Sequence, residues 1–194
     1  EQDVLKRVNI AGALPDRAGG DSFGFAFNNG SGNKIDTFLE GEASYDVTVD
    51  RVAGTVTGSA QLTLRNEAPS SGLPDYVIGN VVGIPKGTNR IQVMIHTGLR
   101  PTGMLVDGQP VIYDTKGELG DTVISAFVDI ASGNSAQVRV DFSGELTGGA
   151  EYRLVVRSPA TVNAIPISVS VNGAEPVVEI SGPGVARVGI DPEP

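Results

Sequence analysis

The sequence predicts an all-β protein, an Ig-like sandwich of two antiparallel β-sheets, and three observations lead to this prediction. Apolar and polar residues alternate with a period of two in short stretches between residues 43 and 171. These stretches recur at intervals of about 8 to 12 residues, with turn-forming residues between them. No helical stretch is long enough to cover a parallel sheet, which excludes a fold of alternating strands and helices.

Composition agrees with this fold class and limits the function. The 194 residues include 26 glycines, 12 prolines and 40% hydrophobic residues, which suits one main core built from strands and tight turns. A formal net charge of −9 and the lack of Lys/Arg clusters exclude a nucleic-acid partner. With no cysteine, disulfides and thiolate chemistry are excluded too. The chain starts at Glu1 without an initiator Met, so we expect it to be a fragment of a longer protein.

The first 40 residues predict a small helix-strand-helix segment. Residues 1–12 place apolar side chains at helical spacing, ending near Gly12. Phe23, Phe25 and Phe27 fall on one side of a strand over residues 22–27. A second helical turn is expected over residues 35–39. We expect residues 1–40 to belong to the end of a preceding domain, with the three phenylalanines partly exposed.

Residues 41–171 are expected to form the sandwich itself. Residues 45–50 and 56–64 predict the first antiparallel pair, which turns near Ala53-Gly54. Hairpins are predicted at Asp107-Gly108 and at residues 132–134, because these residues favour tight turns. The remaining predicted strands are 89–98, 103–106, 109–114, 121–130, 136–144, 151–158 and 166–172. Residues 172–194 are expected to add one strand at 177–180 before a fraying tail.

Three segments carry a resemblance to a known family: residues 28–50, residues 65–80 with the motif LPDYVIGN, and residues 85–90 with PKGTNR. Together they resemble the C-terminal portion of an uncharacterised actinobacterial cell-envelope protein family, a domain of unknown function encoded near surface-polysaccharide genes. The resemblance extends loosely from residue 9 to residue 171. It implies a secreted or membrane-anchored, wall-facing protein, of which this chain is the C-terminal piece, with any anchor expected upstream. It implies no reaction and no catalytic residues.

A metal site is a first candidate, at the loop after residue 28. Asn29, Ser31, Asn33 and Glu40 occupy positions 1, 3, 5 and 12 of a calcium-loop template. The neutral Asn29 at position 1 and Lys34 at position 6, where glycine is needed, depart from the template. The alternative interpretation is a turn that caps a short helix.

Acidic residues and the only histidine are further candidates. Asp114, Glu118 and Asp121 lie within one expected connection, which could bind a hard cation or simply remain solvated. His96 falls on the strand face of Gln92 and has no recognisable nucleophile motif near it, so hydrolysis by a Ser/His/Asp triad is not expected. Spacing nominates no pair of carboxylates for glycoside cleavage, and aromatic platforms for sugars are scarce.

The segment at residues 70–80 is the preferred candidate for partner binding. We expect a long ordered connection, anchored on the sandwich by Tyr76, Val77 and Ile78. It either binds a partner or merely crosses between sheets. The candidate partner-binding residues are Ser70, Ser71, Leu73, Asp75 and Tyr76.

The resulting functional hypothesis is a non-enzymatic cell-envelope module without a cofactor, which recognises or positions surface polysaccharide or an envelope protein. One alternative is an accessory domain of an envelope-polymer assembly enzyme whose catalytic region lies upstream. Another is a passive spacer.

Overall fold

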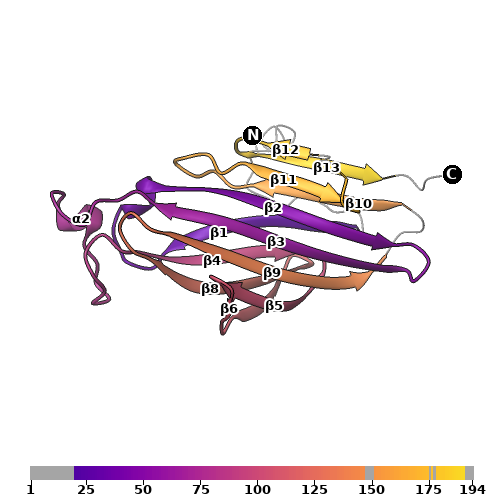
Figure 1. Cartoon of the computed structure of the whole chain (residues 1–194), viewed down its shortest axis with the longest axis horizontal. Coiled ribbons are helices and arrows are strands. Elements are labelled where there is room, and N and C mark those ends of the chain that lie inside the picture. The colour runs from indigo at the N-terminus through magenta and orange to yellow at the C-terminus, as the bar shows by residue number, and fades with distance from the viewer. Residues whose placement is uncertain (1–19, 147–150, 175, 177, 191–194) are drawn as a thin grey trace.

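The computed structural model describes residues 20–146, 151–174, 176 and 178–190, which form two β-sheets packed face to face (Figure 1). The predicted all-β sandwich is confirmed. The expected helix over residues 1–12 lies outside the described residues. Among the described residues, no helix combines the length and the apolar character that a membrane crossing requires.

Sheet A has six strands in the order β13-β10-β1-β4-β8-β7. Their bounds are β1 Asp21–Asn29, β4 Asn89–Thr97, β7 Asp114–Glu118, β8 Asp121–Ile130, β10 Tyr152–Ser158 and β13 Gly184–Ile190.

Sheet B has seven strands in the order β12-β11-β2-β3-β9-β5-β6. Their bounds are β2 Leu39–Asp50, β3 Thr55–Asn66, β5 Arg100–Val106, β6 Gln109–Pro110, β9 Ser135–Glu145, β11 Ile167–Val171 and β12 Val178–Ile180. Two short helical turns precede β2 and β4, the 3-10 turn Ile35–Phe38, which confirms the turn expected at 35–39, and α2, Asp75–Ile78.

The sheets are mixed rather than wholly antiparallel, which corrects one part of the prediction. Strand β1 runs parallel to β10, and β11 runs parallel to β2. More than 100 residues separate the partners in each pair. Chain connections of that length can reverse direction freely, whereas a short turn enforces an antiparallel neighbour.

Strand β1 lies inside sheet A, between β10 and β4, and not in a preceding unit. Phe23 and Phe25 therefore point into the core, where they are 1% and 3% exposed, and Phe27 is half-buried. The expected exposure of this face is wrong, because β1 pairs on both sides and its inner face meets sheet B. The rings of Phe23 and Tyr45 of β2 stack with their centroids 4.5 Å apart.

Two predicted hairpins are confirmed and one is wrong. Strands β2 and β3 pair along their whole length, and β5 and β6 turn at Asp107-Gly108, where both φ angles are positive. Residues 132–134, in contrast, connect β8 of sheet A to β9 of sheet B. The backbone of Asn66, at the end of β3, exchanges hydrogen bonds with Gly133 and Asn134. The turn-forming residues 132–134 therefore make a corner between the two sheets and not a hairpin within one.

Two segments expected to be irregular are strands. Residues 114–121 form the β7–β8 hairpin, in which Leu119 and Gly120 take φ angles of 50° and 91°. The sequence does not predict this hairpin, because glycine, asparagine or aspartate, and not leucine, is the usual residue at a positive φ angle. In the tail, β12 is confirmed, and β13 adds an unexpected strand by pairing with β10.

Candidate functional site

A hollow lies on the outer face of sheet A, over the small residues of β1. Ser22, Gly24 and Ala26 share this face, because alternate residues of a strand point to the same side. In register with Gly24 lie His96 of β4 and Arg157 of β10. A Cβ atom at Gly24 would stand 3.3 Å from the Cβ of Arg157, so the absence of a side chain there keeps the hollow open.

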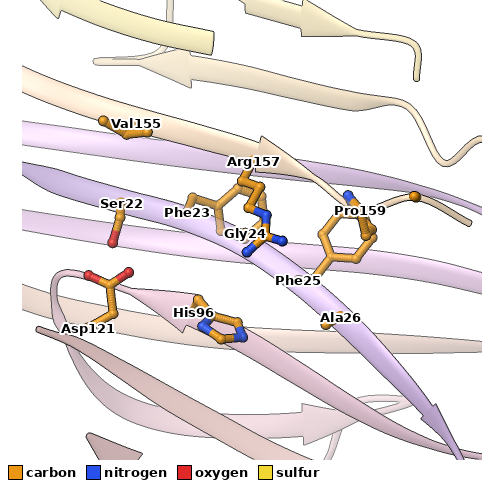
Figure 2. Close-up of a pocket in the computed structure, with 11 residues that line it drawn as sticks. Ser22, Phe23, Gly24, Phe25, Ala26, His96, Asp121, Val155, Arg157 and Pro159 are labelled. Atoms are coloured by element: carbon orange, nitrogen blue, oxygen red, sulfur yellow. The ribbon is translucent and has the colours of Figure 1, made fainter. Parts of the chain in front are cut away.

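The hollow is a cavity of about 110 Å³. Figure 2 shows the Arg157 side chain reaching toward β1 at Gly24, with His96 and Asp121 on the other side of the strand. Val155 and Pro159 form an apolar wall of the cavity on the side of Arg157. The four strands β1, β4, β8 and β10 thus each contribute a lining residue.

Three polar groups around the cavity lack a partner within the described part of the chain. Ser22 is only 8% exposed, and its buried hydroxyl makes no hydrogen bond. His96 Nδ1 is buried without a partner as well. The guanidinium of Arg157 makes none of the ion pairs found among the described residues. Buried polar groups normally find partners, so the unpartnered Ser22 and His96 atoms, in residues that line one cavity with the half-buried Arg157, mark this cavity as the candidate ligand site.

The electrostatics of His96 favour its neutral form. Burial lowers the pKa of His96 below its ordinary value, and the positive charge of Arg157 lowers it further, while Glu118 and Asp121 raise it. At neutral pH the imidazole therefore offers one N–H donor and one acceptor nitrogen. The charge of the site comes from Arg157 on one side and from Asp121 on the other.

Charges of both signs lie on this face of sheet A, and Lys116 of β7 shares the row of His96, since both residues are in register with Val123. Arg157 and Arg187 lie on the neighbouring strands β10 and β13, where each pairs with a valine of the other strand. Glu118 and Asp121 lie on the opposite side of β1, in β7 and β8. Neither arginine takes part in an ion pair among the residues described. The β10–β13 side is thus suited to an anion.

Ser22, His96 and Asp121 are the residue types of a hydrolytic triad, and the sequence analysis did not bring them together. In the structure they line one cavity, but the Ser22 hydroxyl donates no hydrogen bond to His96. Triad chemistry needs that bond to remove the serine proton. In this structure the three side chains are therefore not joined by the hydrogen bonds of a triad. No short motif connects residues spread over four strands, so spacing alone offered no signal.

The calcium-loop candidates are engaged with one another and with the backbone. Asn29 Oδ1 accepts hydrogen bonds from the backbone N–H of Ser31 and Gly32 at 2.8 and 2.9 Å. Asn29 Nδ2 donates to Asn33 Oδ1 at 2.9 Å. Glu40 lies beyond the loop, in β2. These bonds make a turn of the Asx type.

The acidic candidates Asp114 and Glu118 lie in β7 and Asp121 begins β8. Within the residues described, no three His, Cys, Asp or Glu side chains form a group that could hold a metal ion. Asp121 is brought to the cavity instead, next to His96.

The expected partner-binding loop lies at one end of the sandwich, around α2 (Figure 1). Ile78 is fully buried against Ile35 and Ala68, which confirms it as an anchor. Tyr76 is 71% exposed and is not an anchor, because α2 turns it away from this cluster. Asp75 forms an ion pair with Lys86 at 2.7 Å.

The other loop candidates differ in burial: Ser70 and Ser71 are exposed, and Leu73 is partly buried against the small cluster. The loop candidates do not line the cavity on sheet A.

Comparisons with known proteins identify distant likenesses of shape only. No protein-family model matches the chain, and no curated protein matches its sequence. A solved structure described as a candidate nutrient-binding protein of Legionella pneumophila is similar with a TM-score of 0.48 and 6% identity, over 77% of this chain and 54% of that one.

Peptidase-related structures give weaker matches. Native yeast LTA4 hydrolase matches with a TM-score of 0.40 and 9% identity, over 69% of this chain and 23% of that one. An M1 zinc metallopeptidase of Deinococcus radiodurans matches with a TM-score of 0.32 and 12% identity, over 61% and 32%. The chain thus spans between about a quarter and about half of the length of these structures. At these values the likenesses carry no functional argument.

Proposed function

We propose that this chain is a non-enzymatic binding module of the cell envelope, whose cavity on sheet A takes the carboxylate of an acidic sugar in surface polysaccharide. One observation carries the proposal. Arg157, Ser22 and His96 line a single cavity, and the Arg157 guanidinium, the Ser22 hydroxyl and His96 Nδ1 each lack a partner in the described structure. A carboxylate would accept hydrogen bonds from the Arg157 guanidinium, whose planar fork matches it.

The acidic side of the cavity favours a sugar acid over other anions. Asp121 beside His96 would repel a doubly charged phosphate, whereas it can accept hydrogen bonds from sugar hydroxyls. Donors and acceptors therefore stand on opposite sides of β1. A ligand with a carboxylate at one end and hydroxyls next to it satisfies both.

The envelope location rests on the resemblance of residues 28–50 and 65–80 to a cell-envelope family. An extracellular position, with an anchor elsewhere in the protein, would bring the cavity to surface polysaccharide. Fractionation of the native cells with an antibody to this chain tests the location, since recovery in the cytosolic fraction would contradict it.

Binding is tested by NMR titration with D-glucuronate, using the ring protons of His96, the only histidine of the chain, as the probe. We expect saturable shifts with D-glucuronate and none with the neutral D-glucose. Arg157→Gln should weaken binding about ten-fold or more, because it removes a charge-assisted hydrogen bond. The matched control is Arg139→Gln on sheet B, whose arginine pairs with Asp141 away from the cavity.

Equal binding by the Arg157→Gln variant, or no shift with D-glucuronate at all, would contradict the proposal. Binding of an envelope protein that glucuronate fails to displace would favour protein recognition instead. Turnover of ester substrates that is lost on Ser22→Ala would contradict the non-enzymatic role.

A further inference from the structure

The cavity continues into a row of outward side chains along β1. Four residues beyond Gly24, Asn28 lies in register with Gln92 of β4, which lies in register with Phe127 of β8. At about 3.3 Å per residue, this row stands roughly 13 Å from the row of Gly24 and His96. The two rows lie on the same face of sheet A, because an even number of residues separates them.

A third row of outward side chains lies between these two rows. Ala26, Met94 and Ser125 form the row in the middle, and all three are partly buried. Each of these side chains is small or flexible, so none stands as a wall between the cavity and Phe127. These side chains form one continuous strip of the outer sheet face, which we call the β1 strip and define by Gly24, Ala26, Asn28, Gln92, Met94 and Phe127.

Phe127 is an exposed aromatic residue in a fixed position. It is 53% exposed, and the guanidinium carbon of Arg90 lies 5.1 Å from its ring centroid. A Cβ at Gly30 would stand 2.9 Å from the ring, so only glycine there leaves room for it. Arg90 is itself held by Asp129 at 3.1 Å. A ring that is held in place and exposed loses little entropy when a ligand packs on it.

The amides beside Phe127 add hydrogen-bonding groups. Asn28 Nδ2 donates to Gln92 Oε1 at 3.4 Å, and Gln92 Nε2 donates to Ser125 Oγ at 3.5 Å. Asn28 Nδ2 also donates to Met94 Sδ at 3.8 Å. All of these bonds are long, Asn28 keeps acceptor capacity at Oδ1, and Gln92 keeps one N–H donor and acceptor capacity at Oε1. An aromatic face with planar amides beside it suits a neutral sugar ring, since the negative ring face attracts the C–H bonds of the sugar.

We propose that the β1 strip binds an acidic oligosaccharide, with a uronate carboxylate at Arg157 and a second, neutral sugar on Phe127. This inference rests on the proposed function and names its ligand as a chain rather than a single sugar. Charge supports the orientation. Arg157 and Arg187 lie near the cavity end without ion pairs in the described structure, whereas Arg90 at the other end is neutralised by Asp129.

The experiment compares D-glucuronate with a tetrasaccharide that alternates glucuronate and N-acetylglucosamine, each titrated by NMR. We expect the tetrasaccharide to bind about four- to ten-fold more tightly than the monosaccharide, because the packing on Phe127 adds to the statistical factor of about two from its two glucuronates. Phe127→Ala should reduce this gain to the statistical factor of about two and leave glucuronate binding unchanged, whereas Arg157→Gln should weaken both ligands. Tyr76→Ala, which truncates an exposed aromatic residue of the α2 loop, is the matched control.

The outcomes separate the two proposals. A gain no larger than the statistical factor of about two, or a larger gain that survives Phe127→Ala, would overturn binding along the β1 strip and leave the proposed function standing. Loss of the gain in Tyr76→Ala would also overturn it and place the second contact at the loop. If neither ligand binds, the proposed function itself fails.

Discussion

The Tyr45 hydroxyl donates a 2.7 Å hydrogen bond to the Asp21 carboxylate across the sandwich, from β2 of sheet B to β1 of sheet A. Tyr152 of β10 donates a second 2.7 Å bond to the same oxygen, and the backbone N–H of Ser22 donates to the other. All of these groups are buried. One carboxylate thus connects the two sheets at the residue that precedes Ser22 of the cavity.

Tyr45→Phe should destabilise the protein by about 1–3 kcal/mol, because it leaves a buried acceptor with one fewer donor. The free energy of unfolding, measured by urea denaturation, checks this expectation. Tyr76→Phe is the control, since Tyr76 is exposed. Equal stabilities of the two variants would contradict a structural role for the cross-sheet bond.

Asp21 should make stability depend on pH in a particular direction. Burial raises the pKa of Asp21 above its ordinary value of 3.8, although the hydrogen bonds from Tyr152 and Tyr45 oppose the shift. The folded state therefore holds the proton more tightly than the unfolded state. Its contribution is fully present below pH 3.8 and is lost as the pH rises through the folded pKa.

The difference in unfolding free energy between wild type and Asp21→Asn measures this contribution, because asparagine remains neutral at every pH. As the pH rises through the folded pKa of Asp21, the wild type should lose stability relative to Asp21→Asn. A difference that does not change with pH would show that Asp21 titrates alike in both states.

His96 should act in the opposite direction. Burial lowers the pKa of His96 below 6.5, so its stabilising contribution is present above pH 6.5 and is lost as the pH falls through the folded pKa. His96→Gln should be less sensitive to acid than the wild type between about pH 6.5 and the folded pKa. Parallel stability curves for the two proteins would argue against burial of this imidazole.

Ile78→Ala should loosen the α2 loop selectively. Ile78 is fully buried in a small cluster with Ile35 and Ala68, separate from the main core. Removing its side chain should cost about 2–5 kcal/mol in local stability and speed amide hydrogen exchange over residues 67–88. Val81→Ala, an exposed site in the same loop, should leave exchange unchanged. Uniformly faster exchange across both sheets would mean that the loop and the core unfold together.

Local patterns in the sequence predicted most individual strands but not their arrangement. Strand β4 alternates strictly, so its inner and outer faces could be assigned from residues 89–97. The place of β1 depends on its pairing with β10, more than 100 residues away, and no local pattern encodes such a pairing. The corner at residues 132–134 was mistaken for a hairpin because its partner, Asn66, lies on a strand far along the chain.

The candidate site could not be found from the sequence for a related reason. Its residues come from four strands, and its main feature is what β1 lacks, a side chain at Gly24. Sequence reasoning instead selected the loop at residues 70–80, where unusual composition is visible locally. Arg157 is linked to His96 and Ser22 only through strand register, because both Arg157 and His96 lie next to Gly24 of β1.

The central claim is that an anionic ligand binds between Arg157 and His96, and the pKa of His96 tests it most directly. The measurement is an NMR pH titration of the single imidazole, with D-glucuronate and with sodium chloride at the same ionic strength. A bound carboxylate should raise the His96 pKa relative to the chloride sample, and Arg157→Gln should reduce that rise at the same ligand concentration. The same His96 pKa in both samples would contradict the account.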